Sequence, residues 1–102
     1  MGYKNSSGKC GYVYILTNKS KSVLYIGVSS TLDKRIIEHK YGQGSKFTIK
    51  YNCTILLYYE KYPNINEAIA REKQLKNWHR SWKLNLIKSK NPTLNNLWKN
   101  LS

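Results

Sequence analysis

The sequence has few acidic residues. Five Asp and Glu stand against eighteen Lys and Arg in a chain of 102 residues, which gives a formal net charge of +13. No acidic residue follows Glu72, whereas basic residues continue to Lys99. So large a charge on so small a protein points to a polyanionic partner, with nucleic acid as the first candidate and a membrane surface or an acidic protein as alternatives.

Cysteine and long apolar segments are also scarce. The two cysteines, Cys10 and Cys53, are too few for a zinc site without support from His39 and His79, so we expect reduced, structural thiols. No segment approaches the roughly 20 apolar residues of a membrane span, and the polar N-terminus MGYKNSSGKC lacks the apolar run of a signal peptide. We therefore expect a soluble protein without a membrane partner, located in the cytoplasm and nucleoid-associated if bacterial.

Proline occurs twice, and no repeat or low-complexity tract interrupts the chain. With 40% hydrophobic residues, the length suits one domain with a modest core. We expect residues 1–102 to form a single domain that is folded over about 11–98, with a flexible N-terminus at 1–9, and to be a monomer or weak dimer.

Apolar periodicity and turn residues divide the chain into six elements. Their order, β-β-α-β-α-α, predicts an α+β fold with a small three-stranded antiparallel sheet flanked by helices, which leave a surface for ligand. The expected strands are 11–16, 23–28 and 53–60, the expected helices are 31–41, 65–79 and 81–90, and 44–52 is expected to be a basic and aromatic loop.

Local signals mark several of these boundaries. Hydroxyls at 29–31 are expected to cap the first helix, and Asn64 with Glu67 three residues later announces the second. The segment from residue 93 onward is expected to fold back, with Leu94, Leu97 and Trp98 covering apolar surface.

Side-chain alternation sorts the residues of the first two strands. Tyr12 and Tyr14 share one face, and Tyr25 shares a face with Gly27, where the absent side chain lets something approach the backbone closely. Tyrosines on strands are commonly packing residues, so strand position alone does not decide between packing and chemistry. The residues assigned to the core are Leu24, Ile26 and Val28.

Helical spacing sets three charged residues apart. Arg35 and His39 lie one turn apart and can together grip a phosphate; the alternative is a surface salt bridge of Arg35 with a residue such as Glu38, and a structural histidine. Glu72 projects from the same side as its apolar neighbours and needs a partner. That partner could be Arg71, a lysine at 73 or 76, or a bound cation.

Taken together, these residues resemble the GIY-YIG nuclease superfamily. YVY at 12–14 matches the first motif, with Tyr12 where the family usually has glycine, and YIG is intact at 25–27. The family places an arginine on the following helix, often with a histidine four residues on, and a glutamate on a later helix. These match Arg35, His39 and Glu72. Nearly the whole chain, from about 11 to 98, is similar to the small single-domain, URI-type members described as predicted or structure-specific endonucleases.

The resemblance implies hydrolysis of a DNA phosphodiester with one divalent ion, Mg2+ or Mn2+. Glu72 would be the metal ligand, and Arg35 would bind the scissile phosphate. Tyr14 or Tyr25 would position or deprotonate the attacking water, with Arg35 and the metal favouring the phenolate. His39 would either accept a proton from that tyrosine or touch the phosphate.

A late asparagine of the family is matched by Asn91, although Asn95, Asn96 and Asn85 also lie near suitable positions. The DNA substrate could be branched or single-stranded, and repair, restriction and mobility are all compatible with the resemblance. A non-catalytic basic nucleic-acid-binding module, or an accessory that needs a partner for catalysis, are the alternative functions. The residues expected to contact DNA are Lys46, Lys50, Lys73, Lys76, Arg80 and Lys83.

Overall fold

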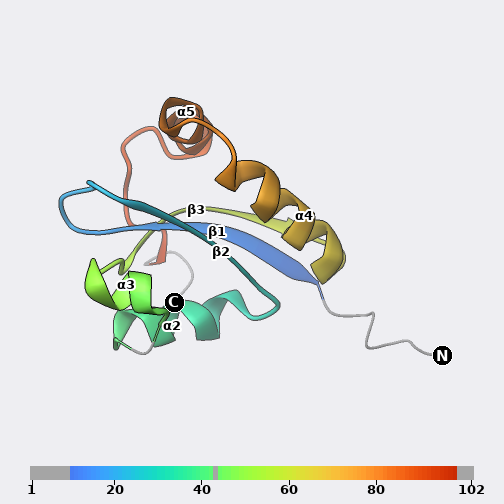
Figure 1. Ribbon diagram of the computed structural model, residues 1–102, viewed down its shortest axis with the longest axis horizontal. Coiled ribbons are helices and arrows are strands. Elements are labelled where there is room, and N and C mark those ends of the chain that lie inside the picture. The colour runs from blue at the N-terminus through green and yellow to red at the C-terminus, as the bar shows by residue number, and fades with distance from the viewer. Residues whose placement is uncertain (1–9, 43, 99–102) are drawn as a thin grey trace.

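The computed structural model describes residues 10–42 and 44–98; the N-terminus expected to be flexible, 1–9, lies outside the described residues. The architecture is α+β, as predicted, with a three-stranded antiparallel sheet and helices on both of its faces (Figure 1). In chain order the elements are β1 (Gly11–Thr17), β2 (Leu24–Ser29), α2 (Leu32–Lys40), α3 (Lys46–Lys50), β3 (Ile55–Tyr62), α4 (Ile65–Lys76) and α5 (Arg80–Lys90).

The sheet places β1 in the centre, between β2 and β3. Tyr14 of β1 stands opposite Gly27 of β2 on one side and Tyr59 of β3 on the other. The pairing with β3 shifts between Ile15 and Leu16, which marks a β-bulge. The central strand therefore carries Tyr14 in the middle of the sheet, where both neighbours fix its position.

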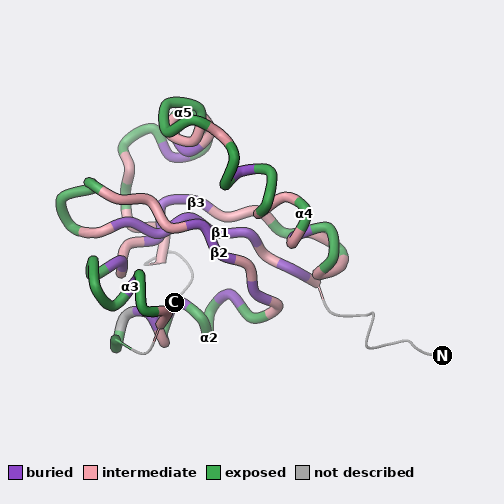
Figure 2. Tube along the Cα trace, viewed as in Figure 1, coloured by how far each residue is buried: buried purple, intermediate pink, exposed green. Residues whose placement is uncertain are grey.

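Helices cover both faces of the sheet. Helices α4 and α5 lie on one side and α2 and α3 on the other (Figure 1). One core cluster lies under α4 and α5, and a second joins Tyr14 and Leu16 of β1 to Leu32 and Ile36 of α2. The central strand β1 is accordingly buried along most of its length, and β2 and β3 each contain buried residues (Figure 2). Because α2 is amphipathic, it buries its apolar residues against the sheet face that carries Tyr14 and Tyr25.

Two local predictions were wrong. The segment expected to be a loop contains α3, which begins after Ser45, whose hydroxyl accepts a hydrogen bond from the Thr48 amide at 3.2 Å. At the start of α2, Thr31 makes no side-chain cap, and the Ser29 hydroxyl instead accepts from the Thr31 amide at 3.0 Å. The cap predicted for α4 is confirmed, since the Asn64 side chain accepts from the amide three residues later at 3.0 Å.

The segment after α5 returns to the outer side of β3. The Leu97 amide donates to the Leu56 carbonyl at 2.8 Å, and the Leu56 amide donates to the Asn96 side chain at 3.1 Å. Leu94 packs on one core cluster and Leu97 and Trp98 on the other, as the sequence predicted. No helix within the described part of the chain is long and apolar enough to cross a membrane.

Candidate active site

A pocket beside β2, an edge strand, gathers the polar residues that the sequence singled out. Its volume is about 290 Å³. Val28 packs on the α4 side of the sheet and Tyr25 on the α2 side, and both line the pocket, so residues from the two faces meet here. The lining residues are Tyr14, Tyr25, Val28, Arg35, His39, Gly44, Ser45 and Glu72.

Tyr14 is the most deeply buried of the polar residues in this pocket. Its side chain is 2% exposed, and its hydroxyl lies 3.4 Å from Nε2 of His39. The ring lies against Gly27, where a Cβ would overlap both the ring and the hydroxyl. The close neighbour that Gly27 was expected to admit is therefore the Tyr14 ring, and the two motif residues form one packing unit.

Burial dominates the acid–base properties of Tyr14. It raises the pKa of Tyr14 far above its usual value, the nearby Tyr25 and Glu72 add to the rise, and the charge of Arg35 opposes it. Arg35 thus acts in the direction expected from the sequence, but desolvation outweighs it. The phenol is protonated at neutral pH and needs an adjacent acceptor to give up its proton.

His39 supplies such an acceptor. Its ring centroid lies 5.9 Å from that of Tyr14 and 5.8 Å from that of Tyr25, and its Nδ1 is 2.9 Å from Oγ1 of Thr48. Gly44 packs directly against this pair, and a Cβ there would overlap both the imidazole and the threonine hydroxyl. The imidazole is therefore held on several sides.

The environment also fixes the charge of His39. Burial lowers the pKa of His39, and the positive charge of Arg35 lowers it further, while Glu38 acts in the opposite direction. The imidazole is consequently neutral at neutral pH. A neutral imidazole has one free lone pair with which it can accept a proton.

Arg35 and Glu72 bring opposite charges to the pocket, and each has a partner on its own helix. Arg35 Nη1 lies 3.2 Å from Glu38 Oε1, and Glu72 Oε2 lies 3.4 Å from Lys76 Nζ. The Arg35 side chain is 44% exposed and that of Glu72 is 16% exposed. Arg35 and Lys76 are the more exposed partner of each pair, and pairs screened by solvent in this way contribute about 0–1 kcal/mol, so a phosphate can compete for Arg35 and a cation for Glu72.

The donor set suits a cation that needs few protein ligands. Among residues 10–42 and 44–98, no three Asp, Glu, His or Cys side chains gather into a metal-binding cluster. A cation in the pocket would therefore have Glu72 as its carboxylate ligand. Mg2+ commonly binds through one or two carboxylates and completes its shell with water and substrate phosphates, so the residues present fit such an ion.

Sequence reasoning missed Gly44, Ser45 and Thr48, because they belong to the segment 44–52, which was expected to be a loop. A signal was present: a serine in front of the segment KFTIK is a typical N-cap. The same helix brings Phe47 against Tyr25, with ring centroids 5.8 Å apart.

Asn91 lies outside this pocket, at the C-terminus of α5. Its amide nitrogen donates to the carbonyls of Leu57 and Asn95, each at 2.9 Å, and its Oδ1 accepts from the Asn95 amide at 3.0 Å. These bonds hold the C-terminal segment against β3. In the described structure, none of Asn85, Asn91, Asn95 and Asn96 lines the pocket.

The basic residues expected to contact DNA are spread over three helices. The guanidinium of Arg80 already has a partner within the protein, since its Nη2 donates to the Lys21 carbonyl at 3.0 Å. The pocket is lined by Ser45, the N-cap of α3, and by Glu72 of α4, so the basic residues of these two helices lie on elements that border it. Lys46 and Lys50 are on α3, Lys73 and Lys76 on α4, and Arg80 and Lys83 on α5.

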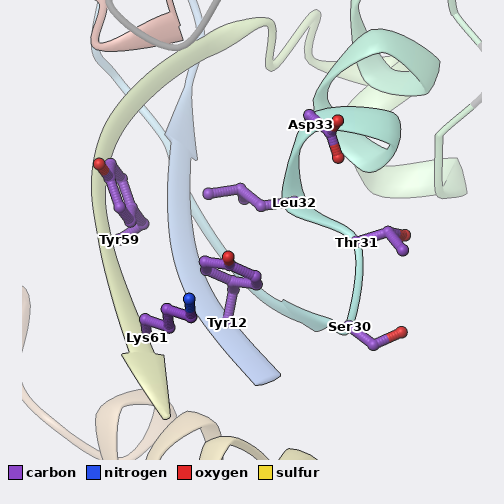
Figure 3. Close-up of a pocket in the computed structure, with 7 residues that line it drawn as sticks. All are labelled: Tyr12, Ser30, Thr31, Leu32, Asp33, Tyr59 and Lys61. Carbon is purple, nitrogen blue, oxygen red and sulfur yellow. The ribbon is translucent and has the colours of Figure 1, made fainter. Parts of the chain in front are cut away.

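A second hollow, of about 460 Å³, opens between β1, β3 and the start of α2 (Figure 3). Tyr12, Tyr59 and Lys61 project from the strands, and Lys61 Nζ lies 5.9 Å from the centre of the Tyr12 ring. Leu32 reaches toward them from the helix (Figure 3). Tyr12 therefore contributes its side chain to this hollow and not to the pocket beside β2.

The sequence and fold match known proteins. A family model described as GIY-YIG catalytic domain matches residues 10–85. A UPF0213 protein of Staphylococcus saprophyticus is 41% identical over 76 residues, which cover 74% of this chain and 92% of that protein. One of Clostridium perfringens is 44% identical over 79 residues, covering 78% and 84% respectively. The solution NMR structure of a UPF0213 protein from Bacillus halodurans matches with a TM-score of 0.55 and 32% identity, covering 85% of this chain and 92% of that one.

Proposed function

Since the chain belongs to the GIY-YIG nuclease family, as a small member similar to the UPF0213 proteins, we propose that it is a divalent-metal-dependent endonuclease acting on DNA phosphodiester bonds. One observation carries the proposal: five polar residues from β1, β2, α2 and α4 line a single pocket. They offer a carboxylate for a cation, a guanidinium for a phosphate, and a phenol–imidazole pair for proton transfer.

Arg35 is the proposed phosphate ligand. Its guanidinium is planar, stays charged at any relevant pH and matches two phosphate oxygens. Its ion pair with Glu38 is partly exposed, so a phosphate can compete for the guanidinium. In this role Arg35 holds the scissile phosphate and offsets the charge that builds up in the transition state.

Tyr14 and His39 are the proposed proton-transfer pair. Oγ1 of Thr48 donates its single proton to the Ser45 carbonyl, 3.0 Å away, and therefore accepts from Nδ1 of His39. This leaves the lone pair of Nε2 directed at the Tyr14 hydroxyl. His39 then accepts the Tyr14 proton as Tyr14 deprotonates the attacking water, and Tyr25 bounds the position of that water.

Glu72 is the proposed metal ligand. When bound there, a Mg2+ or Mn2+ ion would supply positive charge to the leaving 3′ oxygen. Lys76 Nζ lies 3.4 Å from Glu72 Oε2. Lys76 would therefore either give up this contact when an ion binds, or keep it while Glu72 holds the ion through its other carboxylate oxygen.

The test is cleavage by a Glu72→Gln variant, which keeps the shape of the side chain and removes its charge. Plasmid and branched, flapped and single-stranded DNA would be incubated with and without Mg2+ or Mn2+. We expect a loss of metal-dependent cleavage of at least about 100-fold, with DNA binding retained. Glu67→Gln, on the first turn of the same helix, is the matched control. Undiminished cleavage by Glu72→Gln would contradict the proposal.

A non-catalytic nucleic-acid-binding module is the second candidate. It is favoured by the charge of +13 and by the fact that Arg35 and Glu72 each have a partner on their own helix. This candidate predicts salt-sensitive DNA binding and no nicking at any metal concentration. The plasmid experiment with the unaltered protein separates the two functions.

A further inference from the structure

Helix α3 carries a surface that the proposed reaction does not use. Phe47, Ile49 and Tyr51 are 40%, 49% and 38% exposed, although all three are large apolar residues. Single exposed apolar residues are common on proteins, but Phe47 and the C-cap residue Tyr51 lie one turn apart with their rings in contact and form a patch, whereas Ile49 projects from another side of the helix. The patch is therefore a candidate binding surface.

Three aromatic rings connect this patch to the candidate active site. The rings of Tyr25 and Phe47 are stacked, with an interplanar angle of 28° and centroids 5.8 Å apart. The rings of Phe47 and Tyr51 follow, with centroids 4.7 Å apart. We call Tyr25, Phe47 and Tyr51 the aromatic row. Because Tyr25 lines the pocket, the row begins at the proposed reaction site and leads away from it.

The positive charges around the row favour a ligand with many negative charges. Lys50 Nζ lies 5.3 Å from the centre of the Tyr51 ring, and Lys46 is at the opposite end of α3. The chain has no acidic residue between Glu38 and Glu60. Flat apolar rings flanked by ammonium groups suit a ligand that carries both flat faces and negative charge. A nucleic-acid strand with unpaired bases has this chemistry, since any base can stack on an aromatic ring.

The row is held in place by the contacts that position His39. Thr48, on the same turn as Phe47, is 3% exposed. Its side chain hydrogen-bonds to His39, and its backbone carbonyl accepts a hydrogen bond from the Cys53 amide at 2.9 Å. Ser45 caps the helix on its other side. Because α3 is fixed at these points, its rings are presented to a ligand with little ordering cost.

We propose that the aromatic row stacks on unpaired bases beside the bond that is cut. The substrate class is thus DNA that is single-stranded next to the cleavage position, either a free strand or the single-stranded arm of a branched or flapped molecule. Within a duplex the faces of the bases are already stacked on one another, so an intact duplex has no such faces to offer. The statement about cleavage rests on the proposed nuclease function, whereas the stacking itself does not.

The experiment measures binding without divalent metal, by fluorescence anisotropy of labelled oligonucleotides at constant salt. An oligo-dT strand is compared with an abasic strand that has the same number of phosphates. We expect the unaltered protein to prefer oligo-dT by about fivefold or more. Phe47→Leu and Tyr51→Leu should each reduce this preference while leaving the affinity for the abasic strand unchanged. Trp82→Leu, which alters a 53% exposed aromatic residue on α5, is the matched control and should keep the preference.

Equal affinity of the unaltered protein for the two strands would overturn the proposal, and this comparison needs no variant to fold. An equal loss on both strands in Phe47→Leu would also overturn it. The proposal would also be overturned if Phe47→Leu and Tyr51→Leu kept both affinities of the unaltered protein but lost self-association in light scattering. The row would then be covered by a second copy of the chain. As no metal or cleavage enters the measurement, its outcome is independent of the test on Glu72.

Discussion

At the scale of single residues, Thr48 determines how the imidazole of His39 is held. It touches no substrate in the proposed reaction and acts through His39, whose Nδ1 it accepts from at 2.9 Å. The tautomer of a histidine is set by the bond that its other nitrogen makes. In the proposed reaction Thr48 would therefore be a positioning residue that keeps Nε2 free for Tyr14.

Replacing Thr48 with valine keeps the shape of the side chain and removes this acceptor. We expect cleavage to fall by about 10- to 100-fold, as for other groups that orient a reacting residue. The pH profile of cleavage should change as well, because His39 no longer has a fixed tautomer. Thr48→Ser should restore both the rate and the profile. A valine variant with normal cleavage and an unaltered profile would exclude this role.

The pKa of His39 predicts how stability depends on pH. Its pKa in the folded protein lies below the unfolded value of about 6.5, so the unfolded chain binds the proton more readily. The stability due to neutral His39 is complete above about pH 6.5 and is lost as pH falls through the folded pKa. The urea midpoint should therefore drop on acidification below that pH. His39→Gln should flatten this dependence, whereas His79→Gln, at an exposed position, should not. Equal slopes of urea midpoint against pH in the unaltered protein and both variants would contradict the prediction.

At the scale of elements, the rotation of α4 decides whether Glu72 reaches the pocket. Arg71, the preceding residue, binds Glu60 of β3 through two bonds, Nε to Oε1 at 3.0 Å and Nη2 to Oε2 at 3.1 Å. Successive residues of a helix point about 100° apart. Anchoring Arg71 on β3 therefore turns Glu72 away from β3 and toward the β2 side. The sequence offered Arg71 as a partner for Glu72, but the structure gives it to Glu60.

Elements with local signals could be predicted from the sequence. Strand alternation predicted β1 and β2, the Asn64–Glu67 pair predicted the start of α4, and the four-residue spacing predicted that Arg35 and His39 share a face. These features depend on neighbours in the chain, so a local pattern is sufficient to predict them.

Features that depend on distant residues could not be predicted in this way. Helix α3 is five residues long, too short to be stable alone, and is held by its cap and by the contact between Thr48 and His39. The burial of Tyr14 depends on α2 folding over the sheet. The pairing of Glu60 with Arg71 joins a strand to a helix. Each of these required the tertiary structure.

At the scale of the whole molecule, the charge of +13 predicts how DNA binding responds to salt. The logarithm of the affinity should fall linearly with the logarithm of the salt concentration, with a slope that reports the number of phosphates contacted. Lys46→Gln and Lys50→Gln should each reduce the magnitude of this slope by about one. Lys88→Gln, in the last turn of α5, is the control. An equal reduction there would mean that DNA also reaches the opposite face of the sheet.

The position of the pocket beside an edge strand affects the aggregation risk of the protein. Exposed edges invite strand-to-strand pairing between molecules, and the C-terminal segment already occupies part of the β3 edge. A strand added to β2 would lie across the pocket and exclude substrate. Aggregation through β2 and the proposed catalysis are thus competing uses of the same edge. The repulsion between two molecules of charge +13 opposes such pairing and thereby favours an accessible candidate active site.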